Sequence, residues 1–217
     1  MSKCTDNCSS NCNWDELILD CIKSYSKPNY TIFDIGANVG NTTENLSQLV
    51  PQGTVYAIEM DTSTFEILSQ REFVNNNVKL LNVALSDKEG EVTIYSGTGD
   101  SCTFNIIGNS SCAHMRMDHV PRGTVKCVTL DWLVSKINIQ PDILKVDVEG
   151  AESKVLAGAK KVLQKCKLAI IENHEHTQFY QLLDILADFN MECFCLRGKH
   201  RLTEDSPSCY QFIAKPK

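Results

Sequence analysis

Apolar residues along the chain occur in short runs that alternate with amphipathic stretches. Runs rich in β-branched residues predict strands at 31–35, 54–58, 78–83, 142–148 and 168–172. Apolar residues at helical spacing predict helices at 41–50, about 61–75, 130–136, 152–164 and 177–189. Repeated strand–helix units of this kind predict an α/β domain with a mostly parallel sheet and helices on both faces.

The two ends of the chain depart from this alternation. Residues 14–25 carry apolar side chains at helical spacing, which predicts a helix that packs on the domain. Residues 1–13 are polar and rich in cysteine, so we interpret them as a tail and residues 14–217 as one domain. Residues 192–196 and 209–214 resemble strands with no helix between them, which predicts a C-terminal antiparallel hairpin.

Two stretches fit the alternation less well. Residues 91–95 alternate polar and apolar side chains, so we expect an extra edge strand or one arm of a hairpin. Residues 97–123 are rich in Gly, Ser, Asn and His and show no period. A long irregular stretch in a compact domain is often a lid or a binding loop.

Composition narrows the class of protein. The 217 residues, 42% hydrophobic and 22% charged, are typical of one globular domain. A net charge of -6 gives no basic footprint, so nucleic acid is not an expected partner. No apolar run is long enough to cross a membrane, and the N-terminus lacks the apolar core of a signal peptide. The odd number of cysteines, 11, fits reduced thiols in the cytoplasm, and the pattern carries no signal for an oligomeric state.

A glycine turn follows the first predicted strand. The segment 34–40, Asp-Ile-Gly-Ala-Asn-Val-Gly, leads from that strand into a helix, and its glycines allow a tight turn and close approach of a ligand. In parallel sheets, ligands bind beyond the carboxyl ends of the strands. The spacing lacks the middle glycine of a pyrophosphate-binding turn, and Asp34 would repel a phosphate but accept a hydrogen bond from an amino group. A tight turn with no ligand is the alternative interpretation of this motif alone.

Two further signals come at the ends of the next strands. Glu59 ends the second predicted strand, where a carboxylate can accept hydrogen bonds from both hydroxyls of a ribose. Residues 82–87 end the third, where an adenine ring would lie. An acidic residue in this place after a glycine turn favours a nucleoside-containing ligand over an empty turn.

The fourth predicted strand carries charged groups. Strands of a covered parallel sheet are usually apolar throughout, yet this one contains Lys145 and Asp147, whose side chains share a face. Buried charges are costly unless they are paired or functional. Asp147 lies near the carboxyl end of the strand and therefore beside the predicted crevice.

The fifth predicted strand adds polar groups at the same rim. It ends in Glu172, Asn173 and His174. Glu149 and Glu152 follow the fourth strand, where the alternative interpretation is that they only stabilise the N-terminus of the next helix.

These segments together resemble the FkbM-type methyltransferases. The likeness covers roughly residues 31–175 and rests on residues 34–42, 129–131, 142–152, 155–159 and 170–172. Its specific part is the Lys-x-Asp-x-Glu-Gly-x-Glu run at 145–152, because the glycine turn alone occurs in many methyltransferases. The resemblance implies a Rossmann-like class I methyltransferase fold, S-adenosylmethionine as methyl donor, and O-methylation of a sugar or other small hydroxylated metabolite.

On this resemblance, the donor is expected to bind along the ends of the first strands. The acceptor is expected to contact the long irregular stretch, where His114, Arg116 and His119 are the polar candidates. The predicted donor-binding residues are Asp34, Gly36, Ala37, Asn38, Gly40, Asn41, Thr42, Glu59, Met60, Ala84, Leu85, Ser86 and Asp147.

Transfer to a hydroxyl requires a group that removes its proton, because a neutral hydroxyl is a poor nucleophile. Asp147 is the candidate base, and Glu172 and His174 are the other catalytic candidates. Asp147 is alternatively a ligand, with Glu149 or Glu172, of a divalent cation such as Mg²⁺, since hard cations prefer oxygen ligands.

Two other functions fit parts of the sequence. A nicotinamide-dependent oxidoreductase uses a related fold, but the spacing of the glycine turn and the carboxylates of the fourth strand count against it. A non-catalytic binding module would keep the crevice motifs without turnover. Separately, Cys4, Cys8, Cys12 and Cys21 offer thiolates for Zn²⁺, although their spacing is looser than in paired Cys-x-x-Cys sites and a reduced tail is the alternative.

Overall fold

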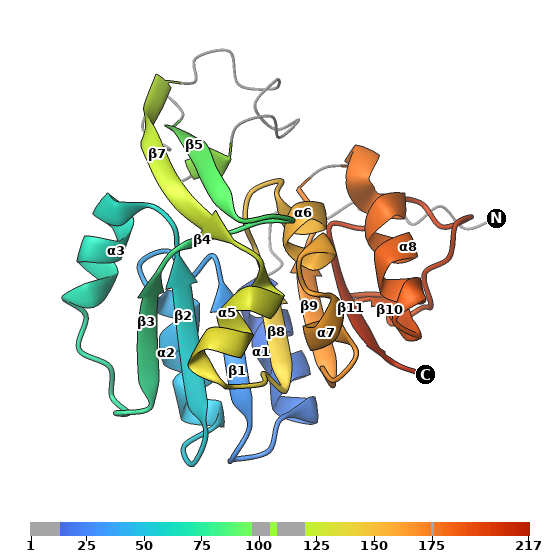
Figure 1. The fold of residues 1–217 in the computed structure, drawn as a ribbon. Helices are drawn as coiled ribbons and strands as arrows, with labels where there is room; N and C mark the ends of the chain where they lie inside the picture. The colour runs from blue at the N-terminus through green and yellow to red at the C-terminus, as the bar shows by residue number, and fades with distance from the viewer. Residues whose placement is uncertain (1–13, 97–104, 108–119, 175) are drawn as a thin grey trace.

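A seven-stranded sheet forms the centre of the domain (Figure 1). The computed structural model describes residues 14–96, 105–107, 120–174 and 176–217. The strand order is β3-β2-β1-β8-β9-β11-β10; β11 runs antiparallel to its two neighbours, and the other pairs are parallel. The strands are β1 (Thr31–Ile35), β2 (Thr54–Glu59), β3 (Val78–Asn82), β8 (Ile143–Val146), β9 (Leu168–Glu172), β10 (Met191–Cys195) and β11 (Gln211–Pro216). The predicted mostly parallel sheet and C-terminal hairpin are confirmed.

Helices cover the two faces of this sheet, as the alternation predicts. On one face, Ile18 and Ile22 of α1 and Leu46 of α2 pack against the buried Ile32 and Val55. The other face is covered by α5 to α8. The helices are α1 (Trp14–Tyr25), α2 (Asn41–Leu49), α3 (Thr62–Ser69), α5 (Leu130–Ile137), α6 (Glu152–Ala157), α7 (Lys160–Leu163) and α8 (Phe179–Asp188), with a 3-10 turn η1 (His176–Gln178) before α8.

Because side chains alternate along a strand, the residues between those just named point to the opposite face of the sheet. Phe33 of β1 and Val146 of β8 lie in one cluster with Val155 of α6 and Leu182 of α8, and all are fully buried. The hydrophobic core therefore has two layers, one on each side of the sheet. No helix in the part of the chain that the structure describes is both long and apolar enough to cross a membrane.

A second, smaller sheet stands beyond the carboxyl ends of β2 and β8 (Figure 1). Its order is β4-β7-β5-β6, with β4 (Ala84–Leu85), β7 (Val120–Val128), β5 (Gly90–Ser96) and β6 (Asn105–Ile107). The prediction of an extra strand near 91–95 is confirmed, but the prediction that 97–123 is irregular throughout is wrong. Pro121 and Gly123 weaken the strand signal of β7, whose partner β5 is distant in sequence.

Two predicted helices are shorter than expected. The helix after β2 ends at Ser69 rather than near 75. The helix predicted at 152–164 is broken into α6 and α7 around Gly158, where a Cβ atom would lie 2.2 Å from the carbonyl oxygen of Ser86. The backbone of this segment therefore breaks where it crosses the second sheet.

Several candidates lie outside the described residues. These are the tail at 1–13 with Cys4, Cys8 and Cys12, and the loop candidates His114, Arg116 and His119. Within the described part, Cys21, Cys127, Cys166, Cys193 and Cys195 form no disulfide bond.

Candidate active site

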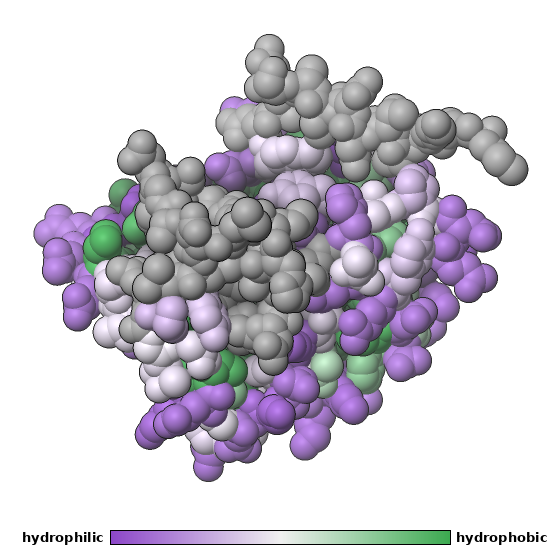
Figure 2. Space-filling model, turned by 90° about the horizontal axis from the view of Figure 1, so that it is seen from above, coloured by the Kyte–Doolittle hydropathy of each residue, from purple (hydrophilic) through white to green (hydrophobic). Residues whose placement is uncertain are grey.

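A pocket of about 400 Å³ opens at the carboxyl ends of the central strands. Figure 2 shows the molecule from this end, where hydrophilic side chains form much of the outer edge of the described part. Of the predicted donor-binding residues, those on the pocket wall are Gly36, Asn38, Glu59, Met60, Leu85 and Asp147. The predicted catalytic and metal-ligating residues Glu149, Glu172 and His174 also line it. The structure thus brings together residues from the ends of five different strands, β1, β2, β4, β8 and β9.

Gly36 brings the first turn against the end of β8. Its φ of +83° is strained for any residue with a side chain, and a Cβ atom there would lie 1.7 Å from the carbonyl oxygen of Asp147. The amide of Asp147 donates to the carbonyl of Ile35 at 3.0 Å. The glycine therefore sets the position of the Asp147 backbone as well as the shape of the turn.

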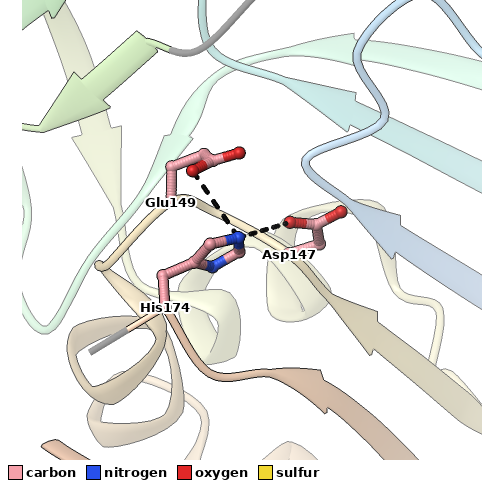
Figure 3. A group of neighbouring side chains, drawn as sticks. All are labelled: Asp147, Glu149 and His174. Carbon is pink, nitrogen blue, oxygen red and sulfur yellow. Dashed lines mark ion pairs between the residues drawn. The ribbon is translucent and has the colours of Figure 1, made fainter. Parts of the chain in front are cut away.

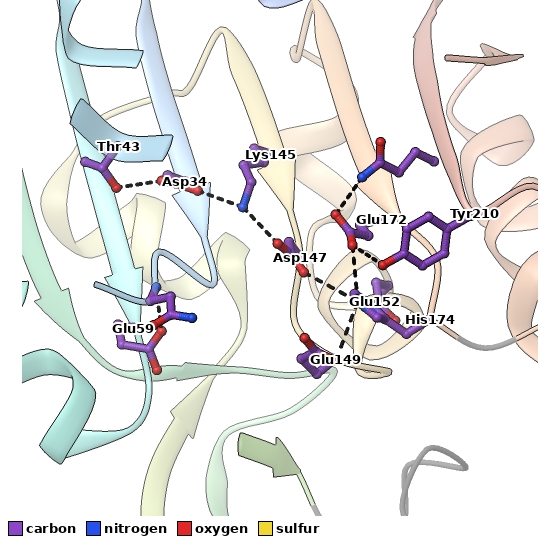
Figure 4. Close-up of polar contacts among 12 residues, drawn as sticks. Asp34, Thr43, Glu59, Lys145, Asp147, Glu149, Glu152, Glu172, His174 and Tyr210 are labelled. Carbon is purple, nitrogen blue, oxygen red and sulfur yellow. Dashed lines mark hydrogen bonds and ion pairs between the residues drawn. The ribbon is translucent and has the colours of Figure 1, made fainter. Parts of the chain in front are cut away.

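Glu59 points into the pocket from the end of β2 (Figure 4). Its two carboxylate oxygens accept the amides of Asn38 and Asp61, each at 2.9 Å. The side chain is largely buried, and this burial raises the pKa of Glu59. Because each carboxylate oxygen can accept more than one hydrogen bond, these amides orient the group and leave it able to accept from ribose hydroxyls.

A chain of buried charges runs from β1 to β8 (Figure 4). Asp34 accepts a hydrogen bond from the Thr43 hydroxyl at 2.6 Å, and its other oxygen lies 3.2 Å from Nζ of Lys145. The same ammonium lies 3.2 Å from Oδ2 of Asp147. Burial alone would lower the pKa of Lys145, but the two carboxylates raise it, so the group stays charged. Asp34 is fully buried and off the pocket wall, and its carboxylate serves this ion pair.

The remaining predicted donor residues lie behind the pocket wall. Gly40 has a φ of +85° and packs against Leu68, and the side-chain oxygen of Asn41 accepts a hydrogen bond from Arg71. The residues of this set that do not line the pocket are Ala37, Gly40, Asn41, Thr42, Ala84 and Ser86. They shape the turn and β4 around the pocket.

His174 lies at the centre of a cluster of carboxylates (Figure 3). Its Nδ1 is 2.8 Å from Glu152, which is buried and also accepts the amide of Gly150. Its Nε2 faces Glu149 at 3.5 Å, Glu172 at 3.5 Å and Asp147 at 3.7 Å. Burial would lower the pKa of His174, but the hydrogen bonds and charges of Glu152, Glu172 and Glu149 raise it to about 11. An imidazolium at neutral pH cannot accept a proton, so the ring is a cationic donor here and not a base.

The carboxylates around this ring differ in proton affinity. Burial raises the pKa of Glu172, but hydrogen bonds from His174 and Tyr210 outweigh it and lower the pKa to about 2. Burial raises the pKa of Asp147 above its usual range and that of Glu149 to about 7. Glu149 also has a φ of +53°, a strained backbone of the kind that the surrounding structure has to maintain. Asp147 and Glu149 are therefore the more basic carboxylates of the cluster, and Glu172 is a weak base.

Three of these groups are placed as metal ligands would be. Asp147, Glu149 and His174 each offer one ligand atom, and these atoms lie within 4.8 Å of one another. Glu172, which the sequence also suggests as a ligand, is not in this group; it accepts hydrogen bonds from Tyr210 and from Gln211. The bond from Nδ1 to Glu152 directs Nε2 toward the other two, an arrangement common behind metal-bound histidines.

Comparison with known proteins places this chain in a family. The model of the methyltransferase FkbM domain matches residues 34–193, which includes the glycine turn and the run at 145–152. The chain belongs to the FkbM methyltransferase family. The implied methyl donor is S-adenosylmethionine, which excludes the nicotinamide-dependent alternative.

Two curated relatives share modest identity with this FkbM methyltransferase. The 2-O-methyltransferase NoeI of Sinorhizobium fredii is 27% identical over 192 residues, covering 79% of this chain and 77% of NoeI. The hexuronic acid methyltransferase AglP of Haloferax volcanii is 27% identical over 146 residues, covering 66% of this chain and 55% of AglP.

Solved structures agree on the fold. The methyltransferase FkbM from Methylobacillus flagellatus has a TM-score of 0.56 at 15% identity, covering 87% of this chain and 44% of that one. The precorrin-6y C5,15-methyltransferase from Geobacter metallireducens has a TM-score of 0.53 at 13% identity, covering 94% and 86%. The Rossmann-like methyltransferase fold is confirmed.

The pocket also contains residues that the sequence did not indicate. Trp14 and Asp15 reach it from the start of α1, and Tyr210 and Gln211 reach it from the start of β11. Because β11 is antiparallel, its first residues lie beside the last residue of β9, with Gln211 opposite Glu172. The predicted hairpin could have indicated Tyr210 and Gln211, because the first residues of an antiparallel strand lie beside the carboxyl end of the strand next to it. No comparable sequence signal marks Trp14.

We predict that Glu59→Ala weakens the binding of S-adenosylhomocysteine by about 1–3 kcal/mol, the usual loss for a hydrogen bond to a charged group. Isothermal titration calorimetry measures this directly. Glu66→Ala, which removes a carboxylate from the exposed side of α3, is the matched control and should bind as the wild type does. An unchanged affinity in Glu59→Ala would show that this carboxylate does not hold the donor.

Proposed function

We propose that this FkbM methyltransferase transfers a methyl group to a hydroxyl of a sugar or another small hydroxylated metabolite. The observation that carries the proposal is the position of Asp147 and Glu149, two carboxylates of raised pKa on the wall of the same pocket as Glu59 and Gly36. Methyl transfer to a hydroxyl needs a base close to the methyl donor that removes the hydroxyl proton, and either of these carboxylates can act as that base. The names of NoeI and AglP, a 2-O-methyltransferase and a hexuronic acid methyltransferase, agree with this choice.

The donor half of the pocket suits S-adenosylmethionine. When bound, this molecule supplies a methyl group already activated on a sulfonium. Glu59 would hold the ribose hydroxyls, and the apolar Ile58, Val83 and Leu85 line the same part of the pocket. The excess of carboxylates near Asp147 favours a positively charged ligand group in this place. The residues of this part of the pocket therefore fit the donor.

Asp147 is the proposed base. Its Oδ2 is held by Lys145, and its Oδ1 faces the His174 ring, so the carboxylate is fixed in direction at the end of β8. A fixed base within reach of an acceptor hydroxyl can take up its proton as the new C–O bond forms. His174, charged at neutral pH, and Glu172, hydrogen-bonded and weakly basic, position this carboxylate.

A divalent cation also fits the cluster, and its binding is a separable part of the proposal. Asp147, Glu149 and His174 would hold it, with the cation taking the place of the proton on Nε2 of His174, and the buried Glu152 would fix the ring. Such an ion lowers the pKa of a hydroxyl bound to it. The mixed nitrogen and oxygen ligands suit Mn²⁺ or Zn²⁺ better than Mg²⁺, because imidazole is a softer ligand than a carboxylate.

The function is tested by methyl transfer from labelled S-adenosylmethionine to a panel of methyl glycosides and uronic acids. We predict that the wild type methylates at least one sugar hydroxyl. Asp147→Asn should bind S-adenosylhomocysteine but transfer methyl about a hundredfold more slowly, the usual scale for the loss of a general base. Glu66→Ala is again the control.

Two results would contradict this account. Turnover of no sugar in the panel, with donor binding intact, would favour the non-catalytic alternative or a different acceptor class. A wild-type rate in Asp147→Asn would make Glu149 the next candidate, since its pKa of about 7 also suits a base.

For the cation, we predict that protein treated with EDTA and dialysed binds one Mn²⁺ per chain by calorimetry. His174→Gln should lose this binding because the nitrogen ligand is replaced, whereas His176→Gln, a nearby histidine outside the cluster, should keep it. If Mn²⁺ does not bind and EDTA leaves the methylation rate unchanged, the base acts without a metal ion.

A further inference from the structure

The pocket extends past Asp147 to a wall that the donor does not need. Trp14 and Asp15 from α1 and Tyr210, the residue before β11, line it together with Glu172 and His174. Trp14 and Tyr210 both lie outside residues 34–193, the segment that the family model matches. This wall is therefore a feature of the chain that family membership does not explain.

The two aromatic rings are in contact with each other on this wall. The ring centroids of Trp14 and Tyr210 are 5.9 Å apart at an interplanar angle of 67°, an edge-to-face contact. Tyr210 makes a second edge-to-face contact with the ring of His174, at 5.7 Å and 80°. The aromatic surface thus continues directly into the carboxylate–histidine cluster.

Both rings are held in place by the fold. The hydroxyl of Tyr210 donates a hydrogen bond to the Glu172 carboxylate. The backbone carbonyl oxygen of Tyr210 accepts a hydrogen bond from the amide of Asn173 at 2.6 Å. Trp14 is the first residue of α1, a helix anchored on the sheet by the buried Ile18 and Ile22. Trp14 itself is only partly buried, so its ring has surface left for a ligand. A preorganised aromatic surface loses little entropy on binding.

The chemistry of this wall suits a pyranose ring. The C–H groups on one face of a pyranose pack well on an aromatic ring, whose face carries partial negative charge. Carboxylates beside the ring, Asp15 and Glu149, can accept hydrogen bonds from the sugar hydroxyls. Small-molecule pockets generally combine apolar or aromatic walls with a few polar groups that fix orientation.

We propose that Trp14 and Tyr210 form the acceptor subsite, on which a pyranose ring packs with one hydroxyl directed at Asp147. The reaction at that hydroxyl rests on the proposed function, but the binding of a sugar to this wall does not. The competing interpretation is that Trp14 only covers the end of α1 against Tyr210.

The kinetic test compares Trp14→Ala and Trp14→Phe, with Tyr25→Ala at the other end of the same helix as the control. We expect Trp14→Ala to raise the KM for the sugar at least about fivefold, with the Kd for S-adenosylhomocysteine unchanged. Trp14→Phe, which restores an aromatic ring, should recover most of the loss. An unchanged KM for the sugar in Trp14→Ala would overturn the proposal.

A binding test separates this proposal from the proposed function. The chain has 2 tryptophans, so Trp132→Phe leaves Trp14 as the sole tryptophan. We expect methyl pyranosides added to the S-adenosylhomocysteine complex to change the Trp14 fluorescence saturably, and glycerol to leave it unchanged. A fluorescence response without methylation of any sugar would refute the function and keep the subsite. Methylation without any response would keep the function and refute the subsite.

Discussion

The ammonium group of Lys145 joins the two halves of the site. It lies between Asp34 on β1 and Asp147 at the end of β8, 3.2 Å from each, and it is almost completely buried. A buried cation with one partner removed would be costly, so neither carboxylate can move far without destabilising the strand ends. The glycine turn and the proposed base thereby have a fixed relation, which Gly36 reinforces by direct contact with the Asp147 carbonyl.

A similar arrangement holds the other side of the site. Glu152, the buried first residue of α6, fixes His174, and the charged ring faces three further carboxylates. The carboxylates of this region outnumber its two cations. Repulsion among these carboxylates favours the binding of a cation, whether a sulfonium or a metal ion. We interpret the excess of negative charge as part of the function, because stability alone does not require it.

Much of the fold and of the donor site follows from local sequence. Alternating strands and helices, the glycine turn, and acidic residues at strand ends predict the sheet and place Gly36, Glu59 and Asp147 on one pocket. The parts that local sequence does not predict depend on contacts between distant segments. The strand β7 forms by pairing with β5. Asp34, which the sequence suggests as a donor-binding residue, instead forms an ion pair with Lys145. His174, and not Glu172, lies in the group of possible metal ligands with Asp147 and Glu149. Trp14 reaches the pocket because α1 packs on one face of the sheet through Ile18 and Ile22.

We infer that the ion pair between Asp34 and Lys145 couples the donor turn to the base. A double-mutant cycle in urea unfolding tests it most directly, with Asp34→Asn, Lys145→Met and the double variant. The two residues contact each other in a buried site, so we predict an interaction free energy of about 1–3 kcal/mol between the two substitutions. Additivity within about 0.5 kcal/mol would contradict the claim, because it would mean that the two residues stabilise the fold independently.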